Sequence, residues 1–123
     1  MIPSEAKFKE VMSSLESKFQ LEQRGETNRY IDTFEPDRDK WIRGIEVKFW
    51  NDERFDTQGW DLLVNYEDLE DFSVFSNYVF KDIKFIIEIN ERDDGILEFD
   101  SLDKAVEKLE EFIEVEMKKR GIL

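Results

Sequence analysis

The chain contains no cysteine and no histidine. Without cysteine it forms no disulfide and offers no thiolate as a nucleophile or metal ligand. Without histidine it lacks the usual general base of enzymes and the commonest transition-metal ligand. The hydroxyl groups therefore have no histidine to activate them, and no motif groups Ser with Lys in its place. We predict a protein that is not an enzyme and needs no cofactor or metal ion.

Glycine, proline and long apolar runs are also scarce. The five glycines are spread over the 123 residues, so no glycine-rich phosphate loop is present. No apolar run is long enough to cross a bilayer, and residues 1–25 do not follow the basic-then-apolar plan of a signal peptide. We therefore expect a cytoplasmic protein with no membrane contact.

Acidic and aromatic side chains are abundant instead. The 31 Asp and Glu outnumber the 18 Lys and Arg, which gives a net charge of −13. Eleven Phe, three Trp and three Tyr provide ample apolar surface for the core of one folded domain, residues 1–123. The acidic balance disfavours direct binding to nucleic acid or to anionic lipid, because both need Lys and Arg.

The negative charge is concentrated in two stretches. Residues 51–75 hold eight acids against one base, and residues 91–100 hold five acids against one base. The remaining 88 residues are nearly neutral, with 18 acids and 16 bases. An acidic patch on a nearly neutral framework indicates a basic protein partner.

Apolar periodicity predicts a helix at each end of the chain. Residues 4–22 place an apolar side chain on one face at every third or fourth position, with Ser4 as the N-cap and Gly25 after the last turn. A second helix is expected from about Leu102 to Arg120, capped by Asp100 or Ser101.

The middle of the chain alternates apolar and polar residues, as strands do. The expected strands are Tyr30–Phe34, Trp41–Trp50, Trp60–Tyr66, Asp82–Asn90 and Ile96–Phe99, the last two forming a hairpin. Gly44 indicates a bulge or a close backbone approach, and residues 67–80 fit either a short helix or an irregular strand. We predict an α+β fold, a single two-layer domain with a largely antiparallel sheet of four to six strands and helices at both termini.

The acidic stretches also contain aromatic residues that could anchor a partner. The candidate partner-binding residues are Trp50, Asp52, Glu53, Phe55, Asp56, Trp60, Asp61, Tyr66, Glu67, Asp68, Glu70, Asp71, Asp93 and Asp94. Two interpretations stay open: a docking surface that attracts a basic protein, or a solvated acidic face whose aromatic residues belong to the core. For Trp50, strand alternation leaves both an exposed position and one beneath the following loop.

Metal-based alternatives are weaker. Asn90–Gly95 has some features of a calcium loop, but Arg92 stands where the second ligand belongs and Ser101 where the bidentate Glu belongs. The acids of 67–71 are neighbours on one segment, whereas a magnesium-dependent site usually draws carboxylates from several elements.

One local pattern resembles a known family. Trp41-Ile-Arg-Gly-Ile-Glu-Val47, followed after a polar loop by Gly59-Trp-Asp-Leu-Leu-Val64, is similar to small immunity proteins of bacterial polymorphic-toxin systems. That group also has a leading helix and a closing helix, while its Asn-Pro before Gly-Trp is replaced here by Thr57-Gln58. The resemblance implies an inhibitor that neutralises a toxin by direct binding, without catalytic residues.

We therefore expect a non-enzymatic acidic inhibitor of immunity type that binds a basic toxin or nuclease. The alternative is a phage-encoded anti-defence inhibitor, of anti-CRISPR or DNA-mimic type, whose carboxylates occupy the nucleic-acid-binding groove of a host protein. Long-range attraction to a positive cleft is common to both. The sequence does not fix the oligomeric state.

Overall fold

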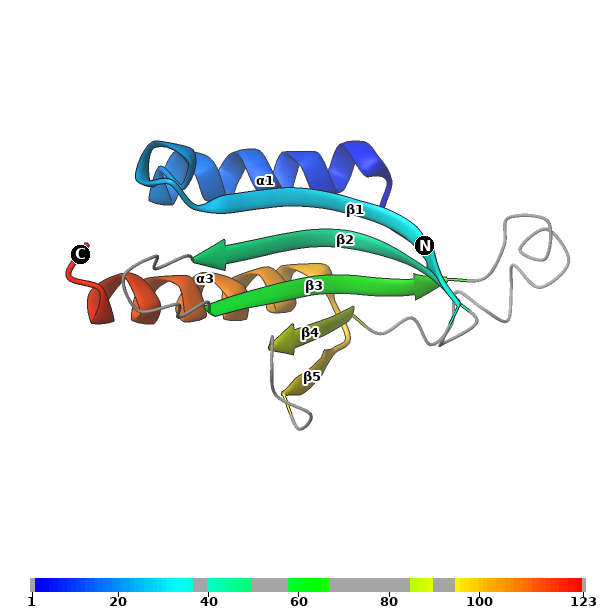
Figure 1. The fold of residues 1–123 in the computed structure, drawn as a ribbon. Helices are drawn as coiled ribbons and strands as arrows, with labels where there is room; N and C mark the ends of the chain where they lie inside the picture. Colours follow the sequence, from blue (N-terminus) through cyan, green and yellow to red (C-terminus); the bar gives the residue numbers. More distant parts are fainter. Residues whose placement is uncertain (1, 37–39, 50–57, 67–84, 90–94, 123) are drawn as a thin grey trace, which may run out of the picture.

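The computed structural model describes residues 2–36, 40–49, 58–66, 85–89 and 95–122, with the backbone alone for Lys40, Asn65 and Tyr66. Along the chain these residues form the elements labelled in Figure 1. The elements are α1 (Glu5–Phe19), a 3-10 turn (Glu22–Arg24), β1 (Thr27–Glu35), β2 (Lys40–Phe49), β3 (Gln58–Tyr66), β4 (Phe85–Ile89), β5 (Ile96–Phe99) and α3 (Leu102–Lys119).

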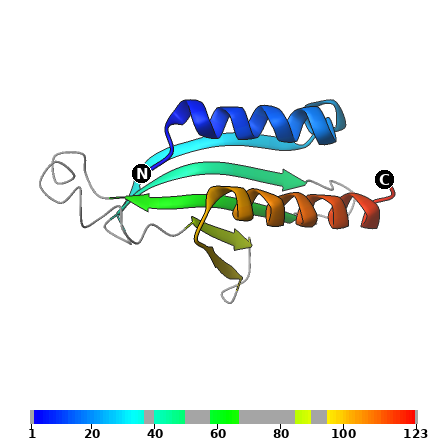
Figure 2. The same ribbon diagram turned by 180° about the vertical axis from the view of Figure 1, so that it is seen from behind.

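The strands form one antiparallel sheet in the order β1-β2-β3-β4-β5. Both helices lie on the same face of this sheet, as the front and back views show (Figures 1 and 2). α1 packs against β1 and β2, and α3 packs against β3, β4 and β5. The predicted α+β fold, with an N-terminal helix, an antiparallel sheet and a C-terminal helix, is confirmed.

Both helices begin at the predicted serine caps. Ser4 Oγ accepts a hydrogen bond from the Lys7 N–H at 3.1 Å, and Ser101 Oγ accepts one from the Lys104 N–H at 3.2 Å. Each serine satisfies a backbone donor that the first helical turn leaves without a partner.

The first helix ends earlier than the sequence predicted. Gln20 adopts the left-handed conformation, with φ 56°, and its N–H bonds Glu16 O at 2.8 Å. The Glu16 carboxylate then accepts the Glu22 N–H at 3.0 Å, which holds the chain in the separate 3-10 turn. Gly25, with φ +80°, ends that turn instead of the helix.

The core lies between the sheet and the helices. Alternate strand residues supply one side of it: Ile45, Val47 and Phe49 of β2, Trp60, Leu62 and Val64 of β3, and Phe85 and Ile87 of β4. The helix stripes supply the other side: Phe8, Val11, Leu15 and Phe19 of α1, and Leu102, Ala105, Leu109, Ile113 and Met117 of α3. The sequence periods of two and of 3.6 residues point these sets at each other.

At Gly44 the backbones of β2 and β3 lie close together. Gly44 pairs in register with Leu63, so the ladder runs through it without a bulge. A Cβ at this position would collide with the backbone carbonyl of Leu62. Of the two readings of Gly44, the structure therefore supports the close backbone approach.

Candidate functional site

Most of the candidate partner-binding residues lie outside the described part of the chain. These are Trp50, Asp52, Glu53, Phe55, Asp56, Glu67, Asp68, Glu70, Asp71, Asp93 and Asp94, together with the side chain of Tyr66. The ambiguous segment 67–80 and the loop Asn90–Asp94 also fall outside it. Trp60 and Asp61 are described completely, and they point to opposite faces of the sheet.

Trp60 is a core residue and does not anchor a partner at the surface. Its side chain is 4% exposed. Its ring stacks on Phe112 of α3, with centroids 5.9 Å apart and planes 4° apart, and meets Phe49 edge-on. The prediction of Trp60 as an accessible anchor is therefore corrected, because α3 covers the face of β3 on which this ring lies.

The ends of the described strands show where the acidic stretches join the sheet. Phe49 pairs with Gln58, and Trp60 pairs with Ile89, so β2 and β4 end on the side of the sheet where β3 begins. The residues that flank 50–57 and 90–94 thus lie at one end of the sheet (Figure 1).

The acids of 67–71 follow Tyr66, at the other end of β3. β3 has nine residues from Gln58 to Tyr66, and its two ends lie roughly 27 Å apart at the usual rise per residue. The acidic stretch 51–75 is therefore divided by β3, and its two halves leave the sheet from opposite ends.

The C-terminal turn of α3 lies at the same end as the flanks of 50–57 and 90–94. The Arg120 guanidinium lies 5.3 Å from the centre of the Phe49 ring, the last residue of β2. Two of the three cations of this turn have carboxylate partners: Arg120 Nε lies 2.9 Å from Glu116 Oε1, and Lys118 Nζ lies 3.2 Å from Glu114 Oε1.

On the sheet face away from the helices, ionisable side chains form a cross-strand row. In register, Arg29 of β1 lies opposite Glu46 of β2, Glu46 opposite Asp61 of β3, and Asp61 opposite Glu88 of β4. Side chains directly opposite each other in a sheet lie within contact distance. We call Glu46, Asp61 and Glu88 the carboxyl row.

The cations near the carboxyl row form ion pairs with Glu46. Its side chain belongs to a residue only 7% exposed, yet Arg29 Nη2 lies 3.3 Å from Oε1 and Lys48 Nζ lies 3.6 Å from Oε2. A buried carboxylate is stable when it is paired in this way. The ion pairs compensate for the burial of Glu46 at one end of the row.

Asp61 has the opposite environment. Its Oδ1 is buried and has no hydrogen-bond partner in the described part of the structure, and Glu46 and Glu88 flank it on both sides. Burial first, and then the charges of Glu46 and Glu88, raise the pKa of Asp61 from 3.8 to about 7, while Lys48 acts weakly in the other direction. A hydrogen bond to Glu46 adds to the same upward shift of the Asp61 pKa, because it favours the protonated carboxyl group.

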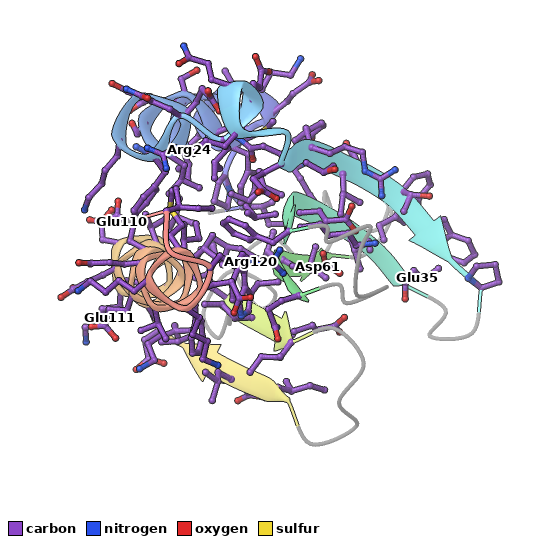
Figure 3. The ribbon with its side chains drawn as sticks, turned by 60° about the vertical axis from the view of Figure 1, so that its left-hand side comes forward. Arg24, Glu35, Asp61, Glu110, Glu111 and Arg120 are labelled. Carbon is purple, nitrogen blue, oxygen red and sulfur yellow. The ribbon has the colours of Figure 1, made fainter. Side chains whose placement is uncertain are left out.

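Seen from the end of the sheet, Asp61 lies apart from the acids of the helices (Figure 3). Asp61 lies within the sheet, whereas Glu110 and Glu111 lie on α3. Glu110 forms an ordinary ion pair with Lys18 of α1, 2.8 Å from its Nζ. The two helices are thus joined at their outer surface.

Sequence reasoning included Asp61 but missed its partners Glu46 and Glu88. Alternation along β2 assigned Glu46 to the face opposite Ile45, which is correct. It could not reveal that Glu46, Asp61 and Glu88 lie in one row, because the register depends on the connections between strands.

A polar groove of about 680 Å³ lies between α1 and the start of β1. Two of its lining side chains take part in local structure: Glu16 bonds the Glu22 N–H, and Asn28 Nδ2 donates to Met12 O at 3.4 Å, while the buried Asn28 Oδ1 has no partner among the described residues. No set of carboxylates within the described residues is arranged to hold a metal ion. Nor does any described helix combine the length and the apolar character of a membrane span.

The described fold is a two-layer α+β sandwich with one helix-covered sheet face. Comparison with known protein families, with characterised proteins and with solved structures gave no significant match to the chain.

Proposed function

We propose that this protein is a non-enzymatic inhibitor of immunity type that acts in the cytoplasm by binding a basic toxin or nuclease. The observation that carries the proposal is the position of the acidic stretches relative to the sheet. The flanks of 50–57 and of 90–94 lie at the same end, and these two segments hold Asp52, Glu53, Asp56, Glu91, Asp93 and Asp94 against two arginines.

This arrangement supports one negative surface rather than several separate ones. Of the three α3 cations at this end, Lys118 and Arg120 form ion pairs with Glu114 and Glu116, which leaves Lys119 against the six acids of the two segments. A surface charge of one sign attracts a partner of the other sign and increases the association rate. The resemblance to immunity proteins favours a toxin as that partner.

Two triple variants test the proposal. The first, Asp52→Lys, Glu53→Lys and Asp56→Lys, reverses charge in the segment 50–57. The matched control, Asp103→Lys, Glu107→Lys and Glu111→Lys, makes the same change in net charge on exposed positions of α3 and leaves the Glu114–Lys118 ion pair intact. We expect the unmodified protein and the control to capture a basic protein at about 50 mM salt, and the first variant to lose it.

The same capture experiment separates the candidate functions. If both triple variants retain the partner equally, the segment 50–57 is not the binding surface and the proposal fails. If the captured protein binds nucleic acid and releases the inhibitor when nucleic acid is added, the DNA-mimic alternative is favoured. A captured toxin that is neutralised without such competition supports immunity.

A further inference from the structure

The carboxyl row brings three acidic side chains together on three adjacent strands. Arg29 and Lys48 both bond Glu46, and Asp61 forms no ion pair with either. The Oδ1 of Asp61 is buried and has no donor among the described residues, so a charge on this oxygen has no hydrogen bond there to stabilise it. The geometry by itself favours a neutral Asp61 between two carboxylates.

We propose that Asp61 retains its proton and shares it with Glu46, and that loss of this proton to water weakens the pairing of β3 with β2 and β4. The sheet would then respond to pH in the range normally sensed by histidine. The inference does not depend on the proposed partner, because it concerns the protein alone.

The charged groups around Asp61 come from every neighbouring strand of the described sheet. β2 contributes Glu46 and Lys48, β4 contributes Glu88, and β1 contributes Arg29 through its ion pair with Glu46. On β5 the residue in the same row is the apolar Ile96. The helices lie on the other face of the sheet.

The sign of the effect follows from linkage. The pKa of Asp61 is about 7 in the folded protein and near 3.8 in the unfolded chain. The folded state therefore holds this proton more tightly, and the stabilisation is complete below about pH 3.8 and lost as the pH rises through 7. Because the chain has no histidine, few other groups titrate in this window.

Urea unfolding at pH 5.5 and at pH 8 measures the effect. We expect the unfolding equilibrium constant of the unmodified protein to rise about tenfold between these two pH values. This rise is smaller than the full difference in pKa between the folded and unfolded states would give, because Asp61 is partly solvated. Asp61→Asn cannot ionise and can still donate a hydrogen bond to Glu46, so its constant should change less than about threefold. Glu98→Gln, on the same face of β5, should behave like the unmodified protein.

Two results would overturn the inference. One is an Asp61 carboxyl resonance, followed by carbon NMR in the unmodified protein, that titrates below pH 5. The other is an Asp61→Asn variant that keeps the whole pH dependence. The NMR titration decides the question even if the variant does not fold, and neither result bears on partner capture.

Discussion

At the scale of one residue, Trp60 illustrates what the sequence can predict and what only the structure shows. Alternation along Trp60, Leu62 and Val64 correctly predicts that they share a face, and the structure buries all three. The anchor hypothesis rested on closeness in sequence to the acids, and β3 separates neighbouring side chains onto opposite faces. Closeness along a strand therefore does not indicate a shared surface.

Truncation of Trp60 should destabilise the fold strongly. Trp60→Ala removes the stacking on Phe112 and leaves a cavity beneath α3, so we expect a loss of about 3–5 kcal/mol in urea unfolding. Trp60→Phe retains an aromatic ring and should cost less, with unchanged partner binding. Weakened binding by a stably folded Trp60→Phe would contradict the assignment of Trp60 to the core.

At the scale of elements, the sequence located both α-helices and the five described strands, but not the 3-10 turn Glu22–Arg24 and not all of the ends. β1 begins at Thr27, earlier than predicted, because Thr27, Asn28 and Arg29 pair with β2 although they show no apolar alternation. Helix α1 ends early because Gln20 takes the left-handed conformation. Glycine is the residue that usually adopts this conformation at the end of a helix, so a glutamine does not indicate it in the sequence. Such ends depend on tertiary pairing and local hydrogen bonds, which composition does not record.

Even the smallest side chain at residue 44 should weaken the pairing of β2 with β3. Gly44→Ala places a methyl group against the Leu62 carbonyl and forces the two strands apart, so we expect a destabilisation of about 1–3 kcal/mol. Ser14→Ala, an exposed change on α1, should stay within about 0.5 kcal/mol. Equal urea midpoints for these two variants would show that the strands do not meet as described.

At the scale of the whole molecule, the distribution of the negative charge is more informative about a binding surface than the net charge. The sequence identified the two acidic stretches, and the strand order shows that 50–57 and 90–94 depart from one end of the sheet while 67–71 follows the other. The proposed surface is correspondingly narrower than the sequence predicted. The proposed surface is centred on the end of the sheet at which Phe49, Gln58 and Ile89 lie.

The association rate of the captured partner, measured against ionic strength, tests the central claim most directly. For the unmodified protein and the α3 control, we predict a rate constant that falls at least tenfold between about 50 and 500 mM salt. For the Asp52, Glu53 and Asp56 variant we predict a slower rate at low salt and a flatter dependence. Identical curves for all three proteins would contradict the account.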